Sequence, residues 1–254
     1  MTTRTGPPEA SADEARAAAA GGDGKRAYVQ QMFSDIAPRY DLLNRVLSAR
    51  IDRRWRRVAI AELAWTRAPA GRYLDLCAGT LDVGVQLAAT RGFSGSVLAA
   101  DFAEPMLRAG QRKVRARAVR PVVADALDLP LADGSADGAI VAFGIRNLAD
   151  LDAGLRETYR VLAPGARFVI LEFSTPRARV VRGAYHAYFH HVLPLVGRAV
   201  SGHPTAYSYL PESVDRFPET DALADRMRAA GFTDVRWRRL TFGIAALHVG
   251  VRPA

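Results

Sequence analysis

Apolar residues recur along the chain with two different spacings, and the change between them divides the chain into two parts. In the first part, residues 27–66, apolar positions recur at helical spacing, which predicts three short helices, the first ending before Pro38. We interpret this part as a helical cap. Residues 1–26 are rich in Ala, Gly, Glu and Thr and show no apolar periodicity, so we predict a disordered N-terminal tail.

Beyond the cap, short apolar strands alternate with helices. The predicted strands cover residues 73–77, 97–101, 121–125, 139–143 and 168–173. Near-continuous apolar strands that alternate with helices are typical of a parallel sheet covered on both faces. Short connections between such strands require right-handed crossovers. This part of the chain therefore predicts a doubly wound α/β sheet.

One long segment interrupts the alternation. Residues 174–219 contain many aromatic side chains and four of the five histidines, and we interpret them as a helical insertion. A helix over residues 221–230 and two final strands, 234–240 and 244–249, then complete the pattern. Because no internal repeat and no second core are visible, we predict that residues 27–254 form a single domain.

Composition sets limits on the class of protein and on its location. Of the 254 residues, 49% are apolar and 24% are charged, as in an ordinary globular protein. The chain has no run of ~18 apolar residues that would span a membrane, and its polar first residues are unlike a secretory signal. Cys77 is the single cysteine, which excludes an intrachain disulfide and a cysteine-cluster metal site. We expect a cytoplasmic protein without a bound metal.

The formal net charge is +9, and nearly all of the 35 basic residues are arginines. One of the densest runs is Arg53-Arg54-Trp55-Arg56-Arg57. Such a charge attracts phosphate groups or an anionic membrane surface. The basic residues are spread over several segments, however, so a solvated surface is the plainer interpretation. A nucleic-acid-binding methyltransferase is a less favoured alternative that rests on charge alone. We expect no nucleic-acid partner, because the Asn/Asp-Pro-Pro-aromatic motif of enzymes that methylate exocyclic amines is absent.

Three acidic residues lie in or at the ends of three successive predicted strands: Asp75, Asp101 and Asp125. The carboxyl ends of parallel strands meet at one edge of a sheet, where ligands bind near the reversal of strand order. Asp101 comes 22 residues after Gly79, the place of an acid that bonds both hydroxyl groups of a ribose. Asp125 would accept from an adenine amine. The alternative role of these acids is to cap helices.

The loop after the first predicted strand shows which nucleotide to expect. Its small residues would let the backbone approach a ligand at a helix N-terminus. The G-x-G-x-x-G pattern of dinucleotide folds is absent, since only Gly79 and Gly84 fit its spacing, and a phosphate-loop lysine is also absent. An acidic pocket without phosphate ligands suits a cation that carries adenosine, which is S-adenosylmethionine. The residues that we expect to bind it are Asp75, Gly79, Thr80, Asp101, Asp125 and Ala126.

Three groups of residues carry a resemblance to a known family. They are Tyr40-Asp41-Leu42-Leu43-Asn44 with Arg53-Arg54-Trp55, then Phe143-Gly144-Ile145-Arg146-Asn147, then Tyr159-Arg160-Val161-Leu162-Ala163-Pro164-Gly165 with Leu171-Glu172-Phe173-Ser174. On these motifs the chain, from about residue 28 to residue 251, resembles the ubiquinone/menaquinone biosynthesis C-methyltransferase family.

The resemblance implies a class I S-adenosylmethionine-dependent methyltransferase fold, Rossmann-like, with seven strands and the last strand antiparallel. It also implies methyl transfer to a ring carbon of a prenylated hydroquinone, either demethylmenaquinol or its ubiquinone-pathway equivalent. Arg146 and Asn147 follow the fourth predicted strand, where Arg146 would hold a developing phenolate and Asn147 would bond a ring oxygen. Tyr40 is implied to face the substrate. For all three residues, a purely structural role is the alternative.

Two histidines are further candidates for the base. His191 and His248 have side chains of the type that exchanges protons near neutral pH, although a histidine in an apolar segment is more often structural. The chain departs from the family at Leu81, where a glycine is usual and permits close ligand contact. We expect the leucine to add bulk beside the methionine tail of the cofactor. This departure supports an alternative function, a natural-product methyltransferase or a cyclase that retains the fold.

The expected substrate is lipophilic, which brings the membrane into the picture. The uncharged segment 183–197, flanked by Arg182 and Arg198, is a candidate for peripheral contact with the inner face of the membrane, with core packing as the alternative. The sequence leaves open which quinone is methylated, how long its tail is, and whether the chain forms a homodimer.

Overall fold

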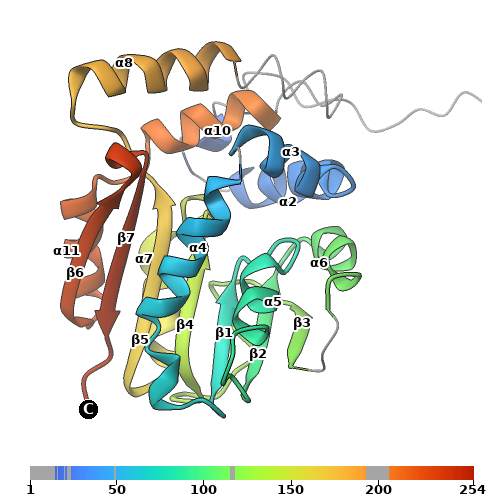
Figure 1. Ribbon diagram of the computed structural model, residues 1–254, viewed down its shortest axis with the longest axis vertical. Coiled ribbons are helices and arrows are strands. Elements are labelled where there is room, and N and C mark those ends of the chain that lie inside the picture. The colour runs from blue at the N-terminus through green and yellow to red at the C-terminus, as the bar shows by residue number, and fades with distance from the viewer. Residues whose placement is uncertain are drawn as a thin grey trace, which may run out of the picture.

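The computed structural model describes residues 24–48, 50–114, 118–192 and 206–254, together with residues 15, 17–19 and 21. Its centre is a seven-stranded sheet with the order β3-β2-β1-β4-β5-β7-β6 (Figure 1). The strands are β1 (Arg72–Leu76), β2 (Ser96–Asp101), β3 (Val119–Val123), β4 (Ala136–Ala142), β5 (Leu162–Phe173), β6 (Thr233–Leu240) and β7 (Ala245–Val251). β7 pairs antiparallel with both β5 and β6, and the other pairs are parallel. The predicted sheet with a reversed last strand is confirmed.

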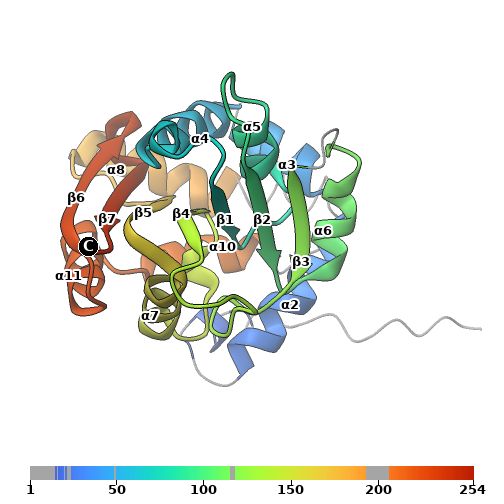
Figure 2. The same ribbon diagram turned by 90° about the horizontal axis from the view of Figure 1, so that it is seen from below.

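The central strands are apolar because helices cover them on both faces. Leu74 of β1 lies opposite Leu98 of β2 and Ala139 of β4, and Leu74 and Ala139 are buried. α4 (Ile51–Glu62) and α5 (Asp82–Ala88) cover one face, and α7 (Leu151–Val161) and α11 (Thr220–Ala229) cover the other (Figure 2). α6 (Glu104–Gln111) lies beside β3 at the sheet edge. Burial on both faces removes the need for alternating polar positions.

The strand order reverses at β1, which has β2 on one side and β4 on the other. In a doubly wound sheet, the connections after the two strands at such a point diverge and leave a crevice at their carboxyl ends. Here the connections are the loop between β1 and α5, and a short 3-10 turn, η2 (Ile145–Asn147), after β4. The fold therefore places residues 77–81 and 143–147 around one crevice.

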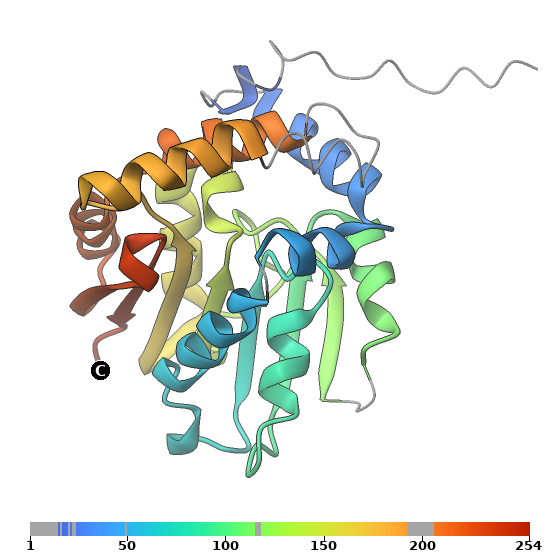
Figure 3. The ribbon, with the colours of Figure 1, turned by 45° about the horizontal axis from the view of Figure 1, so that its top comes forward.

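Four helices cross above the carboxyl ends of the strands, and we call them the roof helices. They are α2 (Gly24–Ile36), α3 (Tyr40–Leu47), α8 (Arg179–Ala187) and α10 (Ala206–Asp215). α8 and α10 lie above the β5 and β7 end of the sheet, and α2 and α3 lie towards β1 to β3 (Figures 1 and 3). A π-helical turn, η3 (Tyr188–Val192), continues α8. Aromatic contacts join the two sides, since the rings of Tyr28 and Tyr209 lie 5.6 Å apart.

The start of the first roof helix differs from the prediction. α2 begins at Gly24, so Lys25 and Arg26, which we assigned to the tail, lie in a helix. Lys25 Nζ donates to the carbonyl oxygen of Arg146 (2.9 Å), which ties the start of α2 to the turn after β4. Most of the predicted tail lies outside the described residues. Two further 3-10 turns complete the elements, η1 (Trp65–Arg67) and η4 (Thr241–Gly243).

Candidate active site

Two adjoining cavities lie between the carboxyl ends of the strands and the roof helices. The acidic cavity has a volume of about 50 Å³ and includes Asp101 and Asp125 in its walls. The apolar cavity is much larger, about 430 Å³, and most of its walls are aromatic or aliphatic. The residues common to both cavities are Phe33, Tyr40, Ala142 and Phe143. These four residues lie at the junction of the two cavities, where ligands in the two cavities would lie close together.

Asp101 organises the wall of the acidic cavity that follows β1. The N–H of Gly79 donates to Asp101 Oδ2 and the N–H of Ala103 donates to Oδ1, each at 2.8 Å. Burial raises the pKa of Asp101, and these two backbone donors oppose the rise. A carboxylate has about four acceptor sites. Asp101 can therefore hold the loop and still accept from the two hydroxyl groups of a ribose.

The loop held by Asp101 is wound by residues in the left-handed region. Cys77, Gly79 and Leu81 have φ angles of 50°, 52° and 66°. A Cβ at Gly79 would lie 3.3 Å from Met106 Cε, so a glycine suits this position doubly. Non-glycine residues held in this region cost free energy and cluster at functional sites. Three positive φ angles within five residues therefore give this loop an unusual backbone conformation at the crevice.

Asp125 faces the acidic cavity from the other side, where a roof helix covers it. Its Oδ1 accepts from the N–H of Leu127 (3.0 Å), and its Oδ2 pairs with Arg26 Nε of α2 (2.8 Å). Gln30 Nε2, also in α2, donates to the carbonyl oxygen of Phe102 (2.9 Å). The volume left under α2 is far below the roughly 300 Å³ of the smallest typical ligand pockets. With α2 in this position, the cavity is too small for a nucleoside, and Arg26 is paired with Asp125.

Four of the six residues predicted to bind the cofactor line this cavity, namely Gly79, Asp101, Asp125 and Ala126. The other two, Asp75 and Thr80, lie outside it. Asp75 Oδ2 accepts from the N–H of Gly84 (2.9 Å) and so holds the first turn of α5, and burial raises the pKa of Asp75 to about 7. Thr80 Oγ1 donates to Asp41 Oδ1 of α3 (2.6 Å). The structure places both residues as supports of the loop.

Leu81 has the positive φ expected at a glycine position, but its side chain points elsewhere than predicted. It is fully buried in the core beneath α5, in one cluster with Val83, Leu87 and Leu107, and it lines neither cavity. The prediction of bulk beside the cofactor tail is therefore wrong. The loop at this residue directs the side chain into the core and not into either cavity. Burial of the leucine offsets part of the backbone cost.

Arg146 lines the apolar cavity and is held by a buried ion pair. Its Nη1 donates to Glu172 Oε1 (2.8 Å) and to the carbonyl oxygen of Phe143 (2.6 Å). Its Nε donates to Ser213 Oγ of α10 (3.3 Å), and its guanidinium lies 5.6 Å from the ring centre of Phe173. The two charged side chains are only 7% and 2% exposed. Burial raises the pKa of Glu172, and the charge of Arg146 opposes that rise.

The other two predicted catalytic residues lie at the junction of the cavities. Tyr40 lines both cavities, and burial raises the pKa of its hydroxyl group. Asn147 lines the acidic cavity only, and its Oδ1 accepts from the hydroxyl of Tyr209 (3.2 Å), which lines the apolar cavity. The structure thus brings Arg146, Asn147 and Tyr40 to one region, with Asn147 on the side of the acidic cavity.

Neither candidate histidine lines these cavities. His248 of β7 is buried, its Nε2 lies 2.9 Å from the carbonyl oxygen of Thr220, and burial lowers its pKa to about 4. His191 is exposed in η3. A base role for either one is not supported by this geometry.

Sequence reasoning assigned no role to four residues that complete the site. Glu172 and Ser213 hold Arg146, and Tyr209 bonds Asn147. Asp52 of α4 supplies the one carboxylate that lines the apolar cavity among the described residues. It accepts from Ser48 Oγ (2.6 Å) and pairs with Arg56 Nη2 (3.0 Å). The sequence could have indicated a role for Glu172. A carboxylate at the end of an apolar strand is expected to be buried, and a buried carboxylate needs a partner of opposite charge.

The chain is similar to proteins with related sequences and to solved structures with related folds. The model of the ubiE/COQ5 methyltransferase family matches residues 22–252. The demethylmenaquinone methyltransferase of Thermus thermophilus is 53% identical over 224 residues, covering 87% of this chain and 100% of that protein. The ubiquinone/menaquinone biosynthesis C-methyltransferase UbiE of Geotalea daltonii is 46% identical over 226 residues, covering 87% and 95%.

Solved structures extend the likeness to the fold. A methyltransferase bound to the Haloferax volcanii Trm112 activator aligns with a TM-score of 0.63 at 18% identity, covering 86% of this chain and 98% of that one. The [4+2]-cyclase SpnF aligns with a TM-score of 0.58 at 16% identity, covering 78% and 81%. At these identities, the likeness concerns the fold alone. On the family model and the identities of its relatives, the chain belongs to the ubiE/COQ5 methyltransferase family.

Proposed function

We propose that this chain is an S-adenosylmethionine-dependent C-methyltransferase of quinone biosynthesis that converts demethylmenaquinol to menaquinol. The observation that carries the proposal is the buried Arg146–Glu172 pair, whose arginine lines a large apolar cavity next to an acidic one. Relatives at 53% and 49% identity over nearly the whole chain are named demethylmenaquinone methyltransferase, which supports this quinone over the ubiquinone-pathway equivalent.

The acidic cavity suits S-adenosylmethionine by the chemistry of its walls. Asp101 would accept from the ribose hydroxyls, Asp125 would accept from the adenine amine once Arg26 releases it, and Gly79 would allow close approach of the backbone. No phosphate-binding lysine or arginine cluster points into this cavity from the described residues. When bound, S-adenosylmethionine supplies an electrophilic methyl group.

The apolar cavity holds and orients the quinol ring and excludes water from it. Tyr40 and Phe143 lie at the junction with the acidic cavity, so the ring carbon that reacts lies near them. Fixing two reactants in a dry site removes much of the entropy cost of their encounter. The remaining volume takes the first part of the isoprenoid tail.

Arg146 stabilises the phenolate that makes the ring carbon nucleophilic. A guanidinium stays protonated at ordinary pH, so its role is electrostatic and Arg146 is not itself the base. Its Nη2 has no acceptor among the described residues, which leaves this donor for a ring oxygen. Glu172 is a positioning residue, because it contacts Arg146 and lines neither cavity. A fixed charge in a low-dielectric site acts most strongly on charge that develops in the transition state.

The hydroxyl proton leaves before methyl transfer. Afterwards the methylated ring carbon loses its own proton, which restores the aromatic ring, and the oxygen is reprotonated, so one proton in total must leave the site. Asp52 is the carboxylate among the described residues that line the apolar cavity. It also lines a charged cleft at the surface of the protein. In this proposal, Asp52 receives the proton through water and passes it to solvent by that route. Ser48 and Arg56 hold the carboxylate in position.

A peripheral contact with the membrane belongs to the same proposal. Val180 of α8 is 87% exposed and Phe242 of η4 is 82% exposed, and their neighbours Val181 and Thr241 line the apolar cavity. Phe242 has a φ of 57°, so strained backbone presents its ring to solvent. The exposed residues Arg177, Arg179 and Arg182 suit an anionic lipid surface. No described helix is long and apolar enough to cross a membrane. The predicted segment 183–197 lies partly outside the described residues.

The test of function is incubation of the purified protein with isotope-labelled S-adenosylmethionine and demethylmenaquinol, followed by mass analysis of the quinol. We expect one labelled methyl group on the ring carbon, formed roughly 100- to 1000-fold more slowly by Arg146→Ala under the same conditions. A labelled oxygen, or an unlabelled rearranged product, would favour the natural-product methyltransferase or the cyclase instead. Leu81, which supported those alternatives, lies in the core and offers them no help.

A further inference from the structure

A third group of charged side chains surrounds a surface cleft of about 480 Å³, which we call the basic cleft. Six basic residues line it: Arg45, Arg50, Arg53, Arg56, Arg112 and Lys113. They come from α3, from the start of α4 and from the end of α6 with the residues after it. We propose that the basic cleft binds a phosphate group, a function that goes beyond the proposed methyl transfer.

The charges of the cleft do not balance. Three acidic residues line it, Asp41, Asp52 and Asp82, so three positive charges remain in excess. Like charges held close together in a partly enclosed space repel each other, and low-dielectric walls strengthen the repulsion. A bound anion of two or more charges would relieve it.

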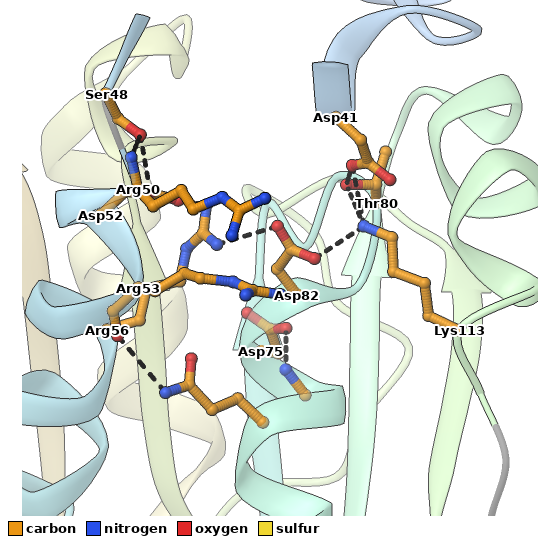
Figure 4. A network of polar contacts seen from close by, with 12 residues as sticks. Asp41, Ser48, Arg50, Asp52, Arg53, Arg56, Asp75, Thr80, Asp82 and Lys113 are labelled. Carbon is orange, nitrogen blue, oxygen red and sulfur yellow. Dashed lines mark hydrogen bonds and ion pairs between the residues drawn. The ribbon is translucent and has the colours of Figure 1, made fainter. Parts of the chain in front are cut away.

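The acidic residues are already paired with three of the six cations. Lys113 Nζ lies 2.8 Å from Asp41 Oδ1 and 2.6 Å from Asp82 Oδ1 (Figure 4). Arg56 lies 2.8 Å from Asp82 through Nη1 and 3.0 Å from Asp52 through Nη2. Arg112 Nη2 lies 3.7 Å from Asp41 Oδ2. These pairs consume the negative charge of the cleft, so the acids are not available to the other three arginines.

Three arginines of the cleft have no carboxylate partner in the part of the chain that the structure describes: Arg45, Arg50 and Arg53. Figure 4 shows the side chains of Arg50 and Arg53 extending in the same direction as Arg56, towards Asp82. Arg50 has a φ of 64°, which holds its backbone in the sparsely populated left-handed region just before α4. Two of the three unpaired arginines, Arg50 and Arg53, therefore extend toward the same place, and Arg45 lines the same cleft.

Guanidinium groups favour phosphate as the ligand. A planar fork with several N–H donors matches two phosphate oxygens at once, and a phosphate group carries more charge than a carboxylate. The acidic cavity shares no residue with the basic cleft, so this site is separate from the one assigned to S-adenosylmethionine. Asn44, Asp52 and Arg56 line both the basic cleft and the apolar cavity, so occupancy of the cleft would be felt at the substrate site.

The phosphate can come from solution or from a lipid headgroup. Leu42 also lines the cleft and is 48% exposed, an apolar side chain beside the cationic ones. This combination suits the boundary between a headgroup and its acyl chains as well as a free anion. The experiment has to separate these two sources.

The test compares two double variants that remove the same charge from the same helix region. One is Arg50→Gln with Arg53→Gln, which alters the cleft. The matched control is Arg54→Gln with Arg57→Gln, two exposed arginines of α4 that do not line the cleft. Far-UV circular dichroism and melting temperature establish that both are folded. Arg45→Gln in α3 serves as a second cleft variant that leaves α4 and its strained start intact.

Two probes are used with each protein. Calorimetric titration with inorganic phosphate measures the solution source, and cosedimentation with phosphatidylcholine vesicles, with and without phosphatidylglycerol, measures the headgroup source. We expect the cleft variants to weaken binding to one of the probes roughly tenfold or more, because charge-assisted contacts are lost. The control should stay within about twofold of the parent, as expected for exposed charges.

The pattern across the probes identifies the source. Loss of phosphate binding assigns a soluble anion, and loss of binding only to the phosphatidylglycerol vesicles assigns a lipid headgroup. The proposal is overturned if the parent binds neither probe, or if the control variant loses as much affinity as the cleft variants. Neither readout depends on methyl transfer, so a failure of the proposed function leaves this test intact.

Discussion

Arg146 and Arg56 line the same apolar cavity, but their charges are balanced in different ways. Arg146 has one carboxylate partner, Glu172, and the pair is enclosed by Phe143, Phe173 and α10. Arg56 bridges two carboxylates, Asp52 and Asp82, and Asp82 continues to Lys113 and the surface. The side chains of Glu172 and Asp82 are 2% and 32% exposed, which shows how differently water reaches the two sites.

The difference indicates which arginine acts on a ligand. An isolated pair in dry surroundings exerts a strong local field, because little screening reaches it. A pair that belongs to a solvated network shares its field with several charges and with water. We therefore expect variants at Arg146 to alter turnover first, and variants at Arg56 to alter stability first. The following experiments can break or sharpen this contrast.

The largest expected effect is that of Arg146→Ala on turnover. Loss of the guanidinium removes a donor aimed at developing charge, so kcat should fall roughly 100- to 1000-fold. Cofactor affinity should change little, because Arg146 does not line the acidic cavity. Arg146→Lys should recover little activity, since an ammonium cannot form the fork that contacts Glu172, Phe143 and Ser213 together. Steady-state methylation with parallel cofactor titration measures both quantities, and near-normal turnover of Arg146→Ala would contradict the assignment.

The second prediction concerns the pH dependence of stability at Asp75, a buried carboxylate on which Arg56 also acts. Burial raises the pKa of Asp75 to about 7 from an ordinary 3.8, although Arg56 acts to lower it. The folded state then binds a proton that the unfolded state has lost, so stability falls as pH rises from about 4 to about 7. Asp75→Asn carries no such penalty, and its advantage over the parent should grow across that window by roughly 3 kcal/mol. Chemical denaturation of both proteins at pH 5 and at about pH 8 measures this difference in stability. An equal difference at the two pH values would contradict the prediction, because the carboxylate would then be ionised at both.

Arg56→Met should affect stability more than turnover. Removing the guanidinium leaves Asp52 with Ser48 and Asp82 with Lys113, so each carboxylate keeps one partner. We expect the free energy of unfolding to fall by roughly 2 kcal/mol, below the usual cost of breaking a fully buried pair because Asp82 is partly solvated. Chemical denaturation measures the loss, and Arg57→Met, an exposed neighbour in α4, is the control. A kcat loss as large as that of Arg146→Ala would remove the contrast between the two arginines.

The smallest effect is expected from Asp52→Asn. An amide keeps the contact with Ser48 but cannot accept the proton, and water entering from the basic cleft replaces it in part. We expect kcat to fall roughly tenfold, toward the low end for a lost general base. Steady-state methylation measures the change. An unchanged rate would show that the proton leaves by another route.

The fold was predictable because it follows from local patterns. The apolar spacing between residues 73 and 173 located each of the first five strands, since each strand is buried on both faces and reads as a short apolar run. The reversed last strand was added by resemblance to a family. The start of α2 was missed because Lys25 and Arg26 carry no apolar signal, and their partners, Arg146 and Asp125, lie far along the chain.

The site was predictable where a residue follows its strand directly. Asp101, Asp125 and Arg146 reach the crevice because strand ends converge there whatever the side chains are. Asp75 occupies a similar place in the sequence, yet its carboxylate turns back to the N–H of Gly84. Periodicity gives the position of a residue in a strand, but not the rotamer or the competing donor that decides where its side chain points.

By itself, then, the sequence determined which segments are strands and which are helices, the crevice at the carboxyl ends of the strands, and the family. These features depend on local spacing and short motifs. The tertiary structure decided which charges are paired. Glu172 meets Arg146 and Lys113 meets Asp41 across separations of 26 and 72 residues, and no local pattern encodes such contacts. It also decided that Leu81 faces the core, and that Arg45, Arg50 and Arg53 line one cleft with no carboxylate partner in the described part of the chain. The reason is that burial and pairing are properties of the packed chain, set by which distant segments share a volume.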